Sequence, residues 1–133
     1  MHPISEILCT VYSKLCEQES IRFPLYEKQR KAIDAVVKTV EGSWFGVTRF
    51  SASEEKAVAY LCFIIKDHPV TDGNKRLALL WFKIYCEVFE LRPQEPEYGY
   101  DALAVGIEKT KLEMDSLLEA VKLILFGKVD MYT

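Results

Sequence analysis

The chain has 133 residues, of which half are hydrophobic, and it carries a formal net charge of −3 at pH 7. This length fits a single domain, residues 1–133, that can bury a core without the help of metals or disulfides. The acidic balance argues against a general nucleic-acid binder, and charged residues break the longest apolar runs well before bilayer length. The four cysteines lie in apolar helical patterns without zinc-site spacing, so we expect reduced thiols in a soluble, cytoplasmic protein with no membrane partner.

The N-terminal part of the chain is predicted to form two amphipathic helices. Apolar residues repeat at helical spacing from Ile4 to Leu15, and a second series runs from Leu25 to Val40 and stops at Gly42. Phe23-Pro24 marks the break between them. His2 stands at the start of the chain, and we assign it no role.

The next segment, residues 43–50, lacks helical spacing. Aromatic and β-branched residues around a glycine predict a short hairpin or an extended flap. The flap residues are Trp44, Phe45, Gly46, Val47, Thr48 and Arg49. An exposed strand can bind a partner chain through its main-chain groups, which would make this segment a docking site for a target protein. The alternative is a connecting loop whose Trp44 and Phe45 complete the core, and the sequence leaves both interpretations open.

Two helices are predicted in the middle of the chain. Ser51 and Glu54 have the spacing of a capping box, which predicts a helix from Ser51 to Asp67. The following helix, from Asn74 to about Phe89, is apolar almost all the way round, which indicates that other helices surround it. We therefore expect this helix to be the most buried element of the domain.

The C-terminal part is predicted to hold two more helices. A break at residues 91–96 with two prolines precedes a short helix around residues 100–107. Thr110 with Glu113 resembles a second capping box, for a last helix that closes at Gly127, and we expect residues 128–133 to be loosely held. The sequence thus predicts a compact all-α domain around a central buried helix, with one short β-like flap.

The segment between the two middle helices carries the candidate site. It reads His68-Pro69-Val70-Thr71-Asp72-Gly73-Asn74-Lys75-Arg76. Pro69 and Asp72-Gly73 favour a loop, so the last three residues stand in the first turn of a helix. Free backbone N–H groups, the positive end of the helix dipole and two adjacent cations make an anion site, and the usual biological anion at such a site is a phosphate.

The residue types of this segment suit transfer of a group from a nucleotide to a protein hydroxyl. Such a transfer needs a base, a phosphate cradle and usually a divalent cation. A histidine is largely neutral near pH 7 and can accept the hydroxyl proton, while an aspartate supplies a hard oxygen for Mg²⁺. The candidate base is His68, the metal ligand is Asp72, and the phosphate site is Gly73, Asn74, Lys75 and Arg76. The alternative is a loop and helix cap whose charges are only solvated.

This motif resembles that of the Fic/Doc family, which reads His-x-Phe-x-Asp-Gly-Asn-Gly-Arg in the Fic branch and ends in Asn-Lys-Arg in the Doc branch. The likeness covers most of residues 44–89 and is closest to Doc and to the Fic/Doc region of RhuM-type virulence proteins. The resemblance implies that His68 is the base, that Asp72 binds Mg²⁺ and that the flap holds the target segment. It also implies ATP or another nucleotide as the donor.

Departures from the Fic pattern favour one reaction within the family. Lys75 replaces the glycine of AMP-transferring members, and Leu79 stands where those members have a second arginine, so both point away from AMP transfer. Val70 replaces the usual phenylalanine, whose side chain anchors the loop in the core, and bears on the loop geometry instead. Similarity to Doc, which carries the same lysine, implies transfer of the γ-phosphoryl group of ATP to a Ser, Thr or Tyr hydroxyl. The alternatives are AMP transfer through the same residues and a non-catalytic protein-binding module. If the chain is the toxin of a toxin–antitoxin pair, we expect control by a separate antitoxin or an attached regulatory domain.

Overall fold

The computed structural model describes residues 1–21 and 24–127 of the chain, without the side chain of Trp44. Within those residues the elements are α1 (Pro3–Glu19), α2 (Glu27–Glu41), β1 (Ser43–Trp44), β2 (Val47–Thr48), α3 (Ser53–Asp67), α4 (Asn74–Val88), α5 (Tyr100–Lys109) and α6 (Met114–Phe126). The all-α prediction is confirmed. Phe23, at the predicted break, and the predicted loose tail at residues 128–133 lie outside the described residues.

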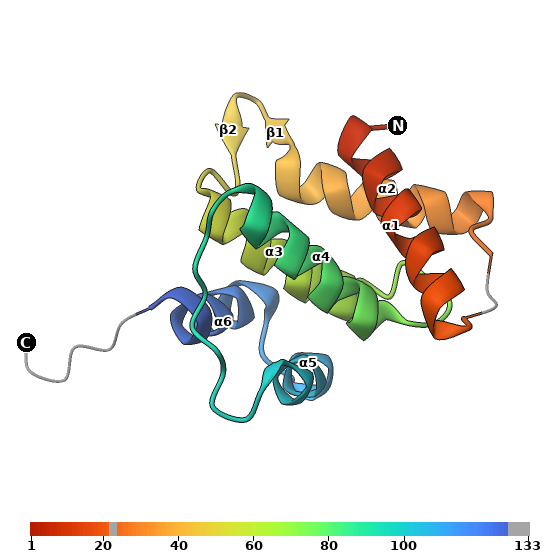
Figure 1. Ribbon diagram of the computed structural model, residues 1–133. Helices are drawn as coiled ribbons and strands as arrows, with labels where there is room; N and C mark the ends of the chain where they lie inside the picture. The colour runs from red at the N-terminus through yellow and green to blue at the C-terminus, as the bar shows by residue number, and fades with distance from the viewer. Residues whose placement is uncertain (22–23, 128–133) are drawn as a thin grey trace, which may run out of the picture.

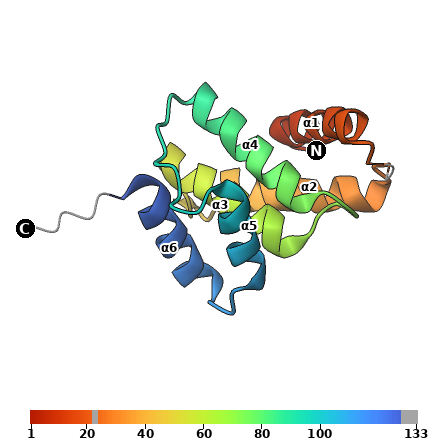
Figure 2. The ribbon, with the colours of Figure 1, turned by 60° about the horizontal axis from the view of Figure 1, so that its bottom comes forward.

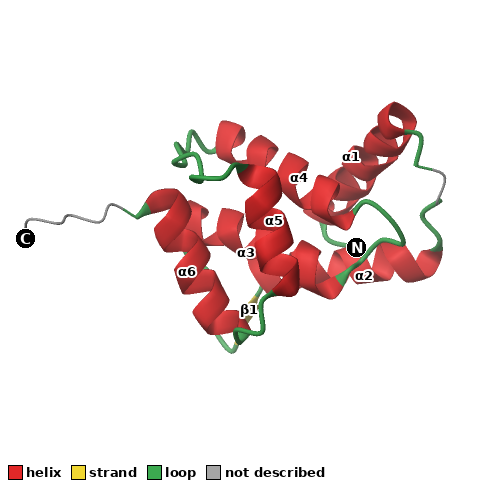
Figure 3. Cartoon of the chain, turned by 90° about the horizontal axis from the view of Figure 1, so that it is seen from below, coloured by secondary structure: helices red, strands yellow, loops and turns green. Residues whose placement is uncertain are grey.

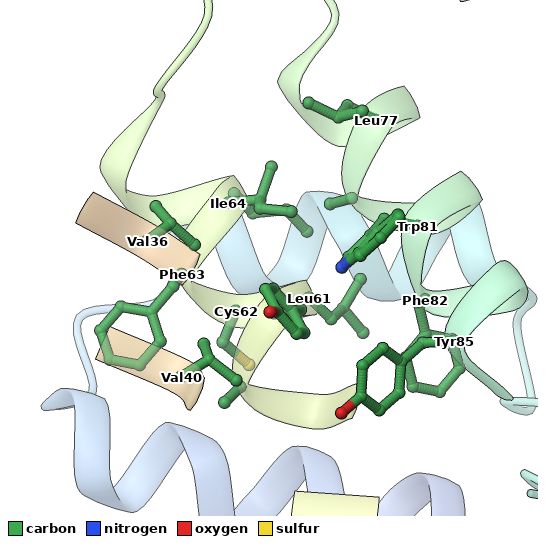
Figure 4. Close-up of a cluster of buried hydrophobic side chains, with 14 of the residues drawn as sticks. Val36, Val40, Leu61, Cys62, Phe63, Ile64, Leu77, Trp81, Phe82 and Tyr85 are labelled. Carbon is green, nitrogen blue, oxygen red and sulfur yellow. The ribbon is translucent and has the colours of Figure 1, made fainter. Parts of the chain in front are cut away.

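The helices are arranged in three groups around one core. Helices α3 and α4 run side by side through the middle, with α1 and α2 on one side and α5 and α6 on the other (Figures 1 and 2). Apolar side chains of α2, α3 and α4 meet between the helices, among them Val40, Leu61 and Trp81 (Figure 4). The loop between α3 and α4 is therefore held by two packed helices.

Helix α3, rather than α4, is the central element. Its buried residues run without interruption from Ala57 to Ile65, because α2, α4, α5 and α6 all contact it. Helix α4 ends in Val88, whose surface is 67% exposed. The prediction that the helix from Asn74 is the most buried element is therefore wrong, although α4 does lie inside the helical bundle.

The two predicted capping boxes are also wrong. The N-cap of α3 is Ala52, which has no side-chain oxygen, and Glu54 is consequently the second residue of the helix and not the third. Thr110 is the C-cap of α5, and its hydroxyl accepts a hydrogen bond from the Leu112 N–H. The N-cap of the last helix is Glu113, three residues later than predicted. In both cases the sequence has the spacing of a capping box, but the helix begins at a later residue than that spacing predicts.

His2 has a structural role that the sequence did not indicate. Its Nδ1 accepts a hydrogen bond from the Ile4 N–H at 3.1 Å, which caps the start of α1. The His2 N–H and the Ser5 hydroxyl both donate to the Asp34 carboxylate, at 3.0 and 2.6 Å. The beginning of α1 is thereby fixed to α2.

Residues 43–48 form the predicted hairpin. Ser43 pairs with Thr48 and Trp44 with Val47, and the two turn residues, Phe45 and Gly46, both have positive φ. The other elements of the described residues are helices joined by loops, so the hairpin is a small addition to a helical fold (Figure 3). The Phe45 side chain is fully exposed, so the alternative in which it completes the core is wrong. Among the described residues, no helix has the length and apolar character needed to cross a membrane.

Candidate active site

The loop of the motif begins and ends with left-handed backbone conformations. His68 follows the last residue of α3 with φ of 50°, and Gly73 precedes the first residue of α4 with φ of 84°. Histidine is among the residues that tolerate this region, and glycine adopts it freely. A Cβ at position 73 would also lie 2.9 Å from Cδ1 of Ile21. The backbone conformation therefore favours glycine at this position, and a larger residue would also displace the end of the Ile21 side chain.

The middle of the loop is closed by two hydrogen bonds between Val70 and Asn74. The Val70 N–H donates to the Asn74 Oδ1 at 3.0 Å, and the Asn74 amide donates to the Val70 carbonyl at 2.8 Å. Val70 itself is buried, as expected of the residue in the place of the family's phenylalanine. The side chain of Asn74 thus stabilises the loop, a role that the sequence analysis did not assign to it.

Helix α1 supports the other end of the loop. The hydroxyl of Tyr12, a buried residue of α1, donates a hydrogen bond to the carbonyl oxygen of Asp72 at 2.8 Å. This bond holds the main chain of Asp72 while the residue itself remains exposed to solvent. A residue sixty positions away in the sequence therefore orients the candidate metal ligand.

The loop and the first turn of α4 line a pocket of about 290 Å³. The lining residues are His68, Thr71, Asp72, Gly73, Asn74, Lys75, Arg76 and Glu108. The first bond of α4 runs from the Leu77 N–H to the Gly73 carbonyl, so the N–H groups of the three preceding residues have no acceptor within the helix. The pocket thus brings together the predicted base, the predicted metal ligand and the predicted phosphate site.

Glu108 is the pocket residue that sequence reasoning missed. It lies in the last turn of α5, and its Oε2 is 3.0 Å from Nζ of Lys75 and 3.9 Å from Nε2 of His68. The hydrogen bond from Lys75 holds the pKa of the Glu108 carboxyl below its usual range. In the sequence, Glu108 follows the apolar positions of a short helix and carries no motif that indicates a site.

Arg76 lies at the opposite side of the first turn and points toward the end of α1. Its guanidinium is 3.9 Å from the carboxylate of Glu19, and both side chains are about half exposed. Such an exposed pair is weak, so Arg76 can turn toward an anion at small cost.

The flap divides into an exposed part and an anchored part. Val47 and Thr48 are exposed, in keeping with a docking edge, whereas the guanidinium of Arg49 pairs with Asp115 of α6 at 3.1 Å. Arg49 also lies over the ring of Phe50, at 5.0 Å from its centroid. Arg49 therefore fastens the base of the hairpin to the body of the protein.

The described residues contain no group of three or more His, Cys, Asp or Glu side chains that could hold a metal ion by themselves. Mg²⁺ in nucleotide sites is commonly bound by one or two carboxylates together with phosphate oxygens. Asp72, which lines the same pocket as Lys75, Arg76 and the first turn of α4, fits that kind of site.

Comparison with known protein families decides the family. A model of the Fic/DOC family matches residues 4–86, which is more than half of the chain. The chain belongs to the Fic/DOC family. Comparison with curated proteins and with solved structures finds no match. The general function of this Fic/DOC chain is that of a protein-modifying transferase with a nucleotide donor, and the match ends before α5, the helix that carries Glu108.

Proposed function

We propose that the chain transfers the terminal phosphoryl group of ATP to a Ser, Thr or Tyr hydroxyl of a target protein, as a member of the Doc-like branch. The observation that carries this proposal is that His68 lines the same pocket as Lys75, Arg76 and the free N–H groups of the first turn of α4. A base beside a phosphate site is the arrangement that transfer to a hydroxyl requires.

The surroundings of Lys75 and Leu79 favour phosphoryl transfer over AMP transfer. Lys75 places a side chain in the pocket, where AMP-transferring members have only a glycine. Leu79 lines a separate apolar cavity of about 510 Å³, together with Leu80 and Phe82. A second phosphate-binding arginine is therefore replaced by a residue that faces away from the phosphate pocket.

In the proposed reaction, the hydroxyl oxygen of the target attacks the γ-phosphorus and a new O–P bond forms. The bond from the γ-phosphorus to the bridging oxygen breaks, and ADP leaves with the electron pair. His68 takes the hydroxyl proton on a ring nitrogen, while Lys75, Arg76 and the backbone N–H groups stabilise the phosphate charge. Mg²⁺ bound at Asp72 would neutralise part of the charge on the donor.

The proposed partners follow from the same surfaces. The exposed hairpin edge at residues 43–48 would bind a segment of the target through its main-chain groups. The hairpin precedes α3 and His68 follows it, so the two lie at opposite ends of that 15-residue helix (Figure 1), and this edge would hold a part of the target remote from the modified hydroxyl. If the protein is a toxin, an antitoxin or an attached regulatory domain would control it. A cytoplasmic location would supply ATP and keep the four free cysteines reduced.

The test is transfer of label to proteins of a bacterial lysate from ATP labelled at the γ- or the α-phosphate. We expect label from the γ position alone and a loss of at least about 100-fold in His68→Ala, because a positioned base contributes about 10²- to 10⁴-fold. His2→Ala is the matched control, since His2 is the other histidine of the chain and caps α1 far from the pocket.

Label from the α position would instead establish AMP transfer. Label that persists in His68→Ala would contradict the role of the base. Absence of label from both positions, with ATP still bound, would favour the protein-binding module.

A further inference from the structure

Glu108 is a second carboxylate, besides Asp72, in a pocket where Lys75, Arg76 and the free N–H groups of α4 favour a phosphate. It lies beyond residues 4–86 that match the family, and the motif assigns it no role. A carboxylate beside a phosphate site repels the phosphates, so its presence weakens donor binding unless it serves the reaction in another way.

The fold holds the main chain of Glu108 firmly. Nζ of Lys66, from the last turn of α3, donates to the carbonyl oxygens of Glu108 and Thr110 at 3.2 and 2.7 Å. These bonds satisfy acceptors at the C-terminal end of α5, where a cation also complements the helix dipole. The neighbouring Ile107 is buried in the core. The side chain of Glu108 therefore projects into the pocket from a fixed point.

A single carboxylate oxygen joins the base to the lysine of the phosphate site. Oε2 of Glu108 accepts a hydrogen bond from Lys75 and also faces Nε2 of His68 at 3.9 Å. The other charged groups around the pocket are Asp72 and Arg76 on its lining, Asp67 and Lys66 at the end of α3, and Lys109 next to Glu108 on α5. Glu108 differs from these groups because one of its oxygens lies close to both Lys75 and His68.

We propose that Glu108 is a positioning residue for the transfer, an inference that rests on the proposed function. Its carboxylate holds the Lys75 ammonium at the His68 end of the pocket, so that the terminal phosphoryl group is drawn to the base. The same carboxylate stabilises the imidazolium that forms when His68 takes the hydroxyl proton. Glu108 thus favours the transition state at the expense of ground-state binding of the donor.

The substitution Glu108→Gln keeps the shape of the side chain and removes its charge. If Glu108 weakens donor binding but speeds transfer, this variant should have a higher affinity for the donor and a lower kcat. ATP–Mg²⁺ should bind about three- to tenfold more tightly, because a negative charge on the lining of the phosphate pocket is lost. The value of kcat should fall about tenfold or more, because Lys75 and His68 lose their shared partner. A merely structural defect would weaken binding and slow turnover together.

The experiment measures ATP–Mg²⁺ affinity by calorimetry and transfer by labelling, in the wild type, Glu108→Gln and Glu108→Asp. Glu119→Gln is the matched control, because it removes the same charge from an exposed position on α6 and should leave both quantities unchanged. Glu108→Asp keeps the charge with a shorter reach, so it should retain wild-type affinity and recover part of the turnover.

Unchanged or weaker binding in Glu108→Gln, or unchanged turnover, would overturn the proposal. The affinity measurement needs no target protein. If the wild type transfers nothing, the proposed function fails. In that case tighter ATP–Mg²⁺ binding by Glu108→Gln would still support the electrostatic role of Glu108, and unchanged binding would overturn that role as well.

Discussion

The side chain of Asn74 makes two hydrogen bonds to the backbone of Val70, four residues earlier in the loop. An asparagine suits this position because its amide supplies one acceptor and one donor at the same time. At the residue scale, a part of the motif that sequence analysis assigned to phosphate binding therefore maintains the shape of the loop. The backbone N–H of Asn74 remains available to an anion at the start of α4.

Asn74→Ala tests which of these roles dominates. Removal of both hydrogen bonds leaves the polar groups of the buried Val70 without partners, so the free energy of unfolding should fall by about 1–3 kcal/mol. Urea unfolding measures the change, and Thr71→Ala, at an exposed position of the same loop, is the control and should have little effect. Lost transfer with an unchanged unfolding midpoint would show that the Asn74 side chain acts on the donor instead.

At the element scale, the contacts of Arg49 with the rest of the protein stabilise the hairpin more than the pairing of its two short strands does. Two strands of two residues each cannot be stable by themselves, and their turn points an exposed Phe45 into solvent. Arg49 supplies the anchor through Asp115 and through the rings of Phe50 and Phe63, which its guanidinium approaches to 5.0 and 5.4 Å. The position of the proposed docking edge thus depends on α6.

Arg49→Met should loosen the hairpin without unfolding the protein. The Arg49–Asp115 pair is largely exposed, so the global free energy of unfolding should change by less than about 1 kcal/mol. Hydrogen exchange of the amides at residues 43–48 should become faster, since the anchor is lost. Lys122→Met removes another exposed cation, from the cavity that Arg49 and Asp115 also line, and should leave this exchange unchanged. Unchanged exchange in Arg49→Met would contradict the anchoring role.

At the scale of the whole molecule, the core buries several groups that must stay protonated. Burial raises the pKa of the Cys62 thiol from 9.0 to about 12 and that of Cys86 to about 11. Burial also raises the pKa of Tyr60, whose hydroxyl donates to Glu41 at 2.7 Å. Above pH 9 the unfolded chain loses these protons before the folded protein does, so the folded state binds more protons.

The free energy of unfolding should therefore be steady up to about pH 9 and then fall as pH rises. Each group that ionises only in the unfolded chain contributes about 1.4 kcal/mol per pH unit. Urea unfolding at pH 8, 9.5 and 10.5 measures the slope, and Cys62→Ala should make it shallower. A free energy that does not change between pH 8 and 10.5 would contradict the assigned burial of these groups.

Local sequence patterns predicted the helices and the hairpin well, because apolar spacing and turn residues act over a few positions. They failed at helix starts such as Ser51 and Thr110, because each helix begins at a later residue although the capping-box spacing is present in the sequence. They also placed the helix from Asn74 at the centre of the core. The place of α3 there depends on how many helices contact it, which periodicity within one helix does not reveal.

The sequence by itself determined the all-α class, the hairpin and the motif at the start of α4, because these depend on residues close together in the chain. Only the tertiary structure decided what surrounds the motif. Tyr12 reaches the Asp72 carbonyl from α1, and Glu108 reaches Lys75 and His68 from α5. Tyr12 and Asp72 are 60 residues apart in the sequence, and Glu108 and Lys75 are 33 residues apart. A local sequence pattern contains no information about such contacts, because it is the packing of distant helices that brings these side chains to the pocket.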